Sequence, residues 1–310
     1  MQVLIQQLII GLSIGSTYAL IALGYTMVYG VLRLINFAHG DVYMVGAVAG
    51  YYISTWTLGI GLSLWLSLTL TFAGSILTCA ILGFLIEYLA YRPLRNRPRL
   101  VLLITAIGVS LLLENLAQLP KLFGPTPRTY PDSVKHALSA TLNCPFLPAG
   151  VTLTQFDLLS LTLSLLLMIY MTYVVMKTRT GLALRAVSHR FDTASLMGVN
   201  TGRIISFTFM FGSGLAAVAG VLDGIRYDVR PLMGIMFGLK AFVAAVLGGI
   251  GSIPGAVVGG LVLGMTETLV KAYLPSQYTG YADAVAFVIL ILILLIKPTG
   301  LFGRNITEKV

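Results

Sequence analysis

The sequence predicts an all-α polytopic membrane protein with eight or nine transmembrane helices, and three observations favour this fold class. Apolar residues make up 57% of the 310 residues and charged residues only 10%, whereas about a quarter of a soluble domain is charged. The mean hydropathy is +0.92. The cations behind the net charge of +9 lie at the ends of apolar stretches, which indicates topology signals beside anionic lipid rather than nucleic-acid binding. We therefore expect residues 1–310 to form a single transmembrane domain.

Six apolar stretches are long enough to span the bilayer, which takes about 20 residues for ~30 Å of hydrocarbon. They are Val3–Val28, Gly61–Ile86, Leu100–Leu119, Phe156–Met176, Ile204–Leu222 and Gly255–Lys271. The first is too long for a cleaved signal peptide. Three further stretches are marginal for a full span: Val42–Trp56, Phe237–Ile250 and Ala284–Ile296. These three are short helices or re-entrant segments shielded by neighbouring helices.

The distribution of Lys and Arg predicts the sidedness of the loops. Residues 92–99 carry four Arg, and residues 177–203 carry five Lys or Arg against one Asp. Such an excess of cations marks cytoplasmic loops, and the tail with Lys297, Arg304 and Lys309 belongs on the same side. The Pro-rich, weakly basic segment 120–155 is expected to be an external loop. Nine spans would place the N-terminus outside and the C-terminus inside.

An internal similarity suggests an inverted repeat. Gly15-Ser16 begins a long helix that precedes the short stretch 42–56, and Gly212-Ser213 lies in a helix that precedes the short stretch 237–250. An offset of five spans inverts the second copy, as in many transporters whose pathway runs between two repeats. The identity is slight, so two glycine-rich helices alike by chance explain it equally well.

The most polar cluster between the first two apolar stretches contains Asn36, His39 and Asp41. Ionisable groups at membrane depth are costly and indicate function, which makes these residues candidates for the transport pathway. The sequence favours a simpler interpretation, a polar turn at the interface in which Asn36 or Asp41 caps the next helix. No second His or Cys lies at ligand spacing from His39, so no metal site is predicted.

Two carboxylates, Glu114 and Glu267, lie deep within apolar stretches. They line an aqueous path or hydrogen-bond neighbouring helices, and the sequence does not separate these alternatives. Two scattered acids are too few to favour a proton-coupled carrier. A third, Glu87, lies near the inner boundary, where we expect it to pair with Arg92.

Glycines are dense around Gly248, Gly249 and Gly251 and continue as Gly255, Gly259, Gly260 and Gly264. A spacing of four lets helix backbones approach closely in a membrane, and Pro254 is expected to break the helix. This pattern favours a sharp inner turn between two tightly packed helices over direct contact with a substrate.

The basic loop 177–203 predicts a docking surface. Between Gly181 and Gly198, apolar residues such as Leu184 and Leu196 recur near helical spacing, while Arg185 and its neighbours stay polar. We expect one amphipathic helix over 182–197 that binds a soluble partner. The alternative is a helix that lies passively on anionic headgroups.

The sequence predicts no catalytic site. The G-x-x-x-x-G-K-[ST] phosphate loop is absent from the sequence, and no nucleophile–base arrangement is visible. We expect a protein that is not an enzyme, and any ATP that drives it to bind to another chain.

Several segments resemble the first permease subunit of branched-chain amino acid ABC importers. The resemblance covers almost the whole chain, and INFAHGD and AVLGGIGSIPGA are its most specific motifs. The external loop 123–154 diverges most. The segments that carry the resemblance are Gly15–Ala47, Glu87–Arg95, Gly181–Ile204, Met236–Thr268 and Pro298–Arg304.

This resemblance implies an ABC importer permease fold in the bacterial inner membrane. It implies as partners a second homologous permease, two cytoplasmic ATPase subunits that bind ATP, and a periplasmic binding protein that delivers leucine, isoleucine or valine. It implies no cofactor in this chain. Residues 181–200 match the family's coupling element, with Ala194 and Gly198 at its small-residue positions. Its candidate contacts are Gly181, Arg185, Ala194, Leu196 and Gly198.

Three other functions stay open at this point. Relatives in the same family import urea or short amides, and the sequence does not exclude these substrates. An ATPase-independent channel or carrier would give the basic loop no role. A membrane scaffold would leave solute uptake unchanged when the chain is deleted.

Overall fold

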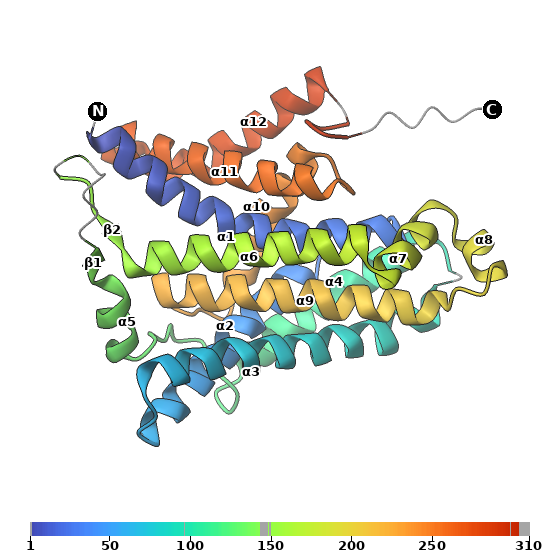
Figure 1. Cartoon of the computed structure of the whole chain (residues 1–310), viewed down its shortest axis with the longest axis horizontal. Coiled ribbons are helices and arrows are strands. Elements are labelled where there is room, and N and C mark those ends of the chain that lie inside the picture. The colour runs from blue at the N-terminus through green and yellow to red at the C-terminus, as the bar shows by residue number, and fades with distance from the viewer. Residues whose placement is uncertain (1, 96, 143–147, 149, 298, 304–310) are drawn as a thin grey trace.

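The computed structural model describes residues 2–95, 97–142, 148, 150–297 and 299–303, and its long helices run side by side as a bundle (Figure 1). Six helices are long and apolar enough to cross a membrane, which confirms the six predicted spans. They are α1 (Gln2–Leu32), α3 (Leu64–Leu85), α4 (Arg99–Gln118), α6 (Gln155–Lys177), α9 (Thr201–Arg226) and α11 (Ile253–Tyr273). A π-helical turn (Ile86–Tyr91) and a 3₁₀ turn (Arg92–Leu94) extend α3.

The three marginal stretches are also helical. The first becomes α2 (His39–Gly59), longer than predicted at both ends, and Gly61 follows it with a φ of +79°. A left-handed residue ends a helix, and glycine adopts that conformation at no steric cost. The other two are α10 (Met233–Gly248), with 16 residues, and α12 (Ala282–Ile296), with 15. At 1.5 Å per residue these two helices extend about 24 and 22 Å, which is less than a full hydrocarbon layer.

The packing of the helices has the pattern of an inverted repeat. The helix α1 packs against α11 as α9 packs against α3, and α2 packs against α9 as α10 packs against α1. The peripheral helix α4 contacts α2 as α12 contacts α10. When α1–α4 are exchanged with α9–α12, each of these contacts turns into its counterpart. A chance similarity between two helices does not explain this correspondence. The odd offset of five spans gives the two halves opposite directions.

Small residues bring α1 and α11 into close contact. A Cβ placed on Gly264 would lie 2.3 Å from the Cα of Gly15, and one on Gly260 would lie 2.5 Å from the Cα of Ala19. Lipid supplies no hydrophobic drive between helices, so this close backbone packing is a main source of their association. Gly255 likewise packs against Gly248 of α10, which confirms that these glycines serve packing.

The predicted sharp turn between two packed helices is confirmed, but two details differ: Gly251 belongs to the turn and not to the helix contact, and Pro254 does not break a helix. Gly251 lies in the turn between α10 and α11 with a φ of +90°, and nothing lies within 4 Å of its Cβ position. Gly249, with a φ of +103°, shapes the same turn. Pro254 lies in the first turn of α11, where a missing N–H is harmless, so it begins that helix instead of breaking one.

The two long loops lie at opposite ends of the bundle (Figure 1). Segment 120–155 contains helix α5 (Asp132–Ser139) and two short antiparallel strands, β1 (Thr141–Leu142) and β2 (Leu153–Thr154), with Thr141 opposite Thr154. At the other end, the expected single helix is wrong, because α7 (Arg179–His189) and α8 (Phe191–Leu196) are separated by an extended Arg190 with φ −148°. Placement at opposite ends is what the topology prediction requires.

Candidate functional site

The first helix of the basic loop, α7, is fixed at its start by backbone contacts. The hydroxyl of Thr178 accepts a hydrogen bond from the Gly181 N–H at 3.1 Å. A Cβ on Gly181 would lie 2.2 Å from the carbonyl oxygen of Val174 in α6. Gly181, a predicted coupling residue, is therefore buried at the α6–α7 corner, where its close contact with α6 sets the angle of α7.

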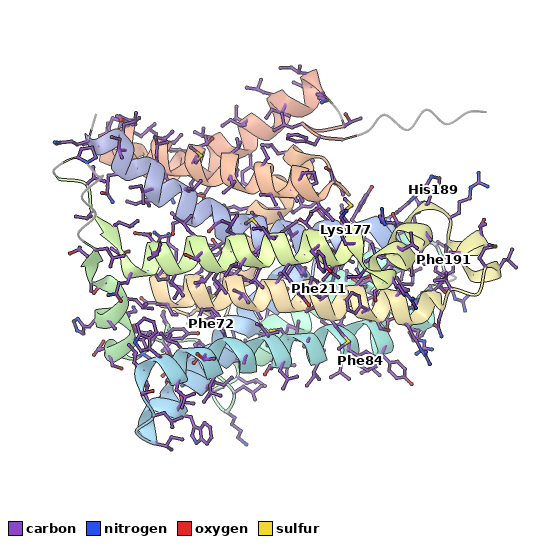
Figure 2. The ribbon with its side chains drawn as sticks, in the orientation of Figure 1. Phe72, Phe84, Lys177, His189, Phe191 and Phe211 are labelled. Atoms are coloured by element: carbon purple, nitrogen blue, oxygen red, sulfur yellow. The ribbon has the colours of Figure 1, made fainter. Side chains whose placement is uncertain are left out.

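The second helix, α8, projects from the bundle with an apolar tip. Leu184, Val187 and Ala194 are buried against the bundle, whereas Leu196 and Met197 are 86% and 80% exposed. Figure 2 shows the labelled Lys177, His189 and Phe191 at this end of the molecule. Exposed apolar residues on a polar protrusion are typical of a surface that binds another protein. We call Phe191–Met197 the α8 tip.

Two other predicted coupling residues, Arg185 and Gly198, lie on either side of the α8 tip in the sequence. Gly198 follows it with a φ of +82° and nothing within 4 Å of its Cβ position, and the Asn200 side chain then caps α9 by accepting from the Arg203 N–H at 3.0 Å. Arg185 is exposed on α7 and donates weakly to the Met176 carbonyl at 3.4 Å. Of the five candidates, Arg185, Leu196 and Gly198 are exposed, while Gly181 and Ala194 are buried.

A basic cavity of about 550 Å³ lies beside this element, between the end of α1, the start of α4 and α7–α8. Its charged lining comprises Arg33, Arg95, Arg97, Arg99 and His189. Arg33 is the one non-glycine residue with positive φ, at +52°, among the described residues. The concentration of cations makes this end of the bundle attractive to acidic groups.

The buried carboxylate of Glu87 connects this cavity to α9. Glu87 accepts hydrogen bonds from Arg95 and, at 2.6 Å, from the hydroxyl of Ser206. The expected pairing with Arg92 is wrong, because the Arg92 guanidinium lies 5.2 Å from the ring centroid of Tyr88 instead. The pair Glu87–Arg95 spans the corner where α3 ends, and the Ser206 bond holds that corner against α9.

The polar cluster at the start of α2 does not cap that helix, so the capping interpretation is wrong. The N-cap position is Ala38, which has no side chain to serve as a cap. Asn36 Oδ1 instead accepts from the hydroxyl of Tyr91 at 2.8 Å. His39 packs against Tyr25, with 4.7 Å between ring centroids, and the carboxylate of Asp41 accepts from Ser110 of α4.

The two deep carboxylates have different surroundings. Glu267 accepts from Lys240 at 2.9 Å and from Tyr18 at 2.7 Å, and Lys240 also pairs with Asp283 of α12 at 2.7 Å. Glu267 therefore serves helix–helix hydrogen bonding. Glu114 lies one helical turn after Ser110, whose hydroxyl donates to Asp41. The structure thus places Glu114 near Asp41 and places Glu267 in a separate network.

Two participants in these contacts were missed from the sequence. Lys240 is the one charged residue in the stretch 237–250, and a lone charge in an apolar stretch is itself a signal of a buried partner. Ser110 carried no signal, because a serine in a membrane helix usually bonds its own backbone.

A bundle of span-length helices built as an inverted repeat, with a projecting helix at its basic end, is the architecture of a membrane permease. The model of the family described as the permease component of branched-chain amino acid transport systems matches residues 7–294. The chain belongs to this family. It is a multi-pass protein of the inner membrane, as its family and its span-length helices together show.

Several named relatives are similar over nearly the whole chain. The high-affinity branched-chain amino acid transport system permease protein LivH of Salmonella typhimurium is 44% identical and aligns with 99% of this chain and 97% of its own length. The corresponding protein BraD of Pseudomonas aeruginosa is 44% identical over 99% of this chain and 98% of its own. Among solved structures, an inward-facing ABC transporter described as of metal-chelate type is 18% identical over 93% of this chain and 85% of its own, with a TM-score of 0.48.

Proposed function

We propose that this chain is one of two permease subunits of an ABC importer that carries leucine, isoleucine and valine across the inner membrane. The observation that carries this proposal is the α8 tip, whose exposed Leu196 and Met197 sit at the basic end of the bundle. Side chains such as these are stabilised by burial against a partner. The near full-length similarity to permeases of branched-chain amino acid systems supports the substrate.

In this proposal the α8 tip binds an ATPase subunit on the cytoplasmic side. ATP binding closes the ATPase pair, moves α7–α8 and favours the outward-open arrangement of the two permeases. Hydrolysis then resets the pathway inward. The rigid corner made by Gly181 against α6 supports this role, because a motion of α8 would pass directly into a membrane-spanning helix.

The remaining partners are those that the resemblance to ABC importer permeases implies. We expect a second homologous permease to pack beside this chain, and a periplasmic binding protein to deliver the amino acid at the end that carries α5 and the short strands. Membrane lipid surrounds the remaining surface. The chain itself would hold no cofactor and perform no enzymatic reaction, since the ATP would bind to the ATPase subunits.

Uptake by the reconstituted complex tests this proposal. Proteoliposomes that contain this chain, the second permease and the ATPases should accumulate labelled leucine when ATP and the loaded binding protein are supplied. They should not accumulate labelled urea. Accumulation of urea in place of leucine would assign the chain to the short-amide importers of its family, and accumulation by this chain alone would contradict an ABC mechanism.

A further inference from the structure

Asp41 lies deep within the bundle, at the point where the start of α2 meets the start of α10. Gly40 packs against Gly234 and Gly238, and a Cβ on Gly234 would lie 2.9 Å from Asp41 Oδ1. The neighbouring His39 abuts Gly24 of α1. Gly24 precedes Arg33 by nine residues, about 13 Å along the helix, so the start of α2 packs well inside the span of α1 and not at its basic end.

The carboxylate of Asp41 forms no ion pair, unlike three of the other four acids that are buried among the described residues. Glu87 pairs with Arg95, Asp157 with Arg226 at 3.0 Å, and Glu267 with Lys240. Asp41 is 2% exposed; its Oδ2 accepts from Ser110, and its Oδ1 has no partner among the described residues. Glu114, another acid, lies one helical turn beyond Ser110 on α4. An uncompensated carboxylate at this depth is costly unless a cation or a proton joins it.

Asp41 lies beside α4, whose Ser110 donates a hydrogen bond to it. Ser110 and Glu114 are one helical turn apart on that helix, and both are partly exposed. Of the six long helices, α4 is the least buried. A ligand on the exposed side of α4 would meet Glu114 and Ser110, with the exposed apolar Ile107 and Leu111 beside them, and the buried Asp41 lies directly behind Ser110.

The chemistry of this site fits a primary ammonium group next to an apolar side chain. An ammonium carries one positive charge and three N–H donors, and the site offers a carboxylate oxygen without a partner, a second carboxylate and a hydroxyl. We propose that Asp41, with Ser110 and Glu114 beside it, binds the ammonium group of the amino acid as it crosses the membrane. This inference rests on the proposed function and adds to it the residues that recognise the substrate.

Two isosteric substitutions test the inference. Asp41→Asn removes the charge and keeps the size and the bond to Ser110, so the fold is retained. Asp223→Asn is the matched control. Asp223 is also buried, at 1% exposed, its Oδ2 accepts from the hydroxyl of Tyr43 at 3.0 Å, and its Oδ1 likewise has no partner among the described residues. It differs from Asp41 in its place, because it lies on α9 and not beside α4. Both variants are measured in the complete reconstituted complex, with leucine uptake and ATP hydrolysis followed in the same vesicles.

We expect Asp41→Asn to lower leucine uptake at least tenfold while hydrolysis stimulated by the binding protein stays within twofold of wild type. Asp223→Asn should leave both within twofold. Uptake by Asp41→Asn close to wild type would overturn the inference. Loss of uptake and hydrolysis together would also overturn it, because that result assigns Asp41 a purely structural role.

Photo-labelling provides a second measurement that does not depend on turnover. L-photo-leucine, which keeps the ammonium group and carries a diazirine side chain, should label the α4 peptide of the wild-type complex and of Asp223→Asn but not of Asp41→Asn. Equal labelling of α4 in Asp41→Asn would contradict the inference alone. Failure of the wild-type complex to accumulate leucine would overturn the proposed function, and this inference with it.

Discussion

Lys240 on α10 and Glu267 on α11 form an ion pair with 2.9 Å between Nζ and Oε1, and both side chains are at most 10% exposed. Asp283 on α12 shares Lys240, and Lys271 shares Glu267. The network therefore balances two positive and two negative charges. It connects α12, which otherwise rests only lightly on the bundle, to α10 and α11.

Removal of Lys240 should destabilise the protein strongly. Lys240→Met leaves the partly exposed Asp283 without its cation and leaves the buried Glu267 with the half-exposed Lys271. Because the buried charge stays partly compensated, the free energy of unfolding should fall by about 2 kcal/mol, less than for a fully uncompensated buried charge. Unfolding of the purified subunit in detergent measures this loss. Lys135→Met is the control, since Lys135 pairs with Asp228 at 3.6 Å on the surface and should contribute less than about 1 kcal/mol. Equal losses in the two variants would contradict the role given to the network.

The contact between α1 and α11 should not tolerate a single methyl group. In Gly15→Ala the new Cβ would lie 2.8 Å from the Cα of Leu261, and two helix backbones must separate to admit it. Overpacking of this kind should cost about 1–3 kcal/mol. Gly30→Ala, in the same helix, has nothing within 4 Å and should be neutral or slightly stabilising. Thermal unfolding of the two variants compares them, and a Gly15→Ala protein as stable as Gly30→Ala would show that the helices are not held this closely.

For the ion pair between Glu87 and Arg95 at the end of α3, a second substitution should restore part of the stability that the first one removes. Arg95→Met leaves the fully buried Glu87 with Ser206 as its remaining donor and should cost about 3 kcal/mol. The double variant Arg95→Met/Glu87→Gln removes the stranded charge and should recover part of that loss. Arg97→Met, at an exposed neighbour, should change stability by less than about 0.5 kcal/mol. A double variant less stable than Arg95→Met would argue against this assignment.

The α8 tip should be needed for coupling and not for folding. Leu196→Glu places a charge on the exposed apolar residue that we expect to bind an ATPase, and it should lower leucine uptake at least tenfold with normal insertion into the membrane. Ala186→Glu adds the same charge on an exposed residue of α7, outside the α8 tip. It should retain most of the uptake. Equal loss in the two variants would point to a general effect of charge.

The sequence predicted the long helices because twenty apolar residues in a row have one stable state in a bilayer. It did not predict the break at Arg190, because the apolar pattern of 182–197 continues through that residue at nearly helical spacing. The short α8 turns away from the bundle there, so Leu196 is exposed while Ala194 is buried. The spacing of apolar residues alone does not predict this change of chain direction.

The polar contacts at the start of α2 could not be predicted from the local sequence, for a different reason. Asn36 looks like a helix cap, but its partner Tyr91 is 55 residues away in the sequence, and Asp41 bonds Ser110 across 69 residues. A capping residue is predicted from its own helix, whereas these partners depend on how α2, α3 and α4 are assembled. The internal repeat was visible in sequence only as two glycine-serine pairs, and the exchange of helix contacts between its halves required the folded chain.

Crosslinking from the α8 tip is the most direct test of the account. Leu196→Cys is introduced with Cys144 replaced by serine, leaving the buried Cys79, and the complete complex is treated in its native membrane with a short bifunctional reagent. The account predicts an adduct with the ATPase subunit whose yield changes when ATP is bound, and no reaction with an impermeant maleimide added from the periplasmic side. Labelling from the periplasmic side, with no adduct to the ATPase, would contradict it.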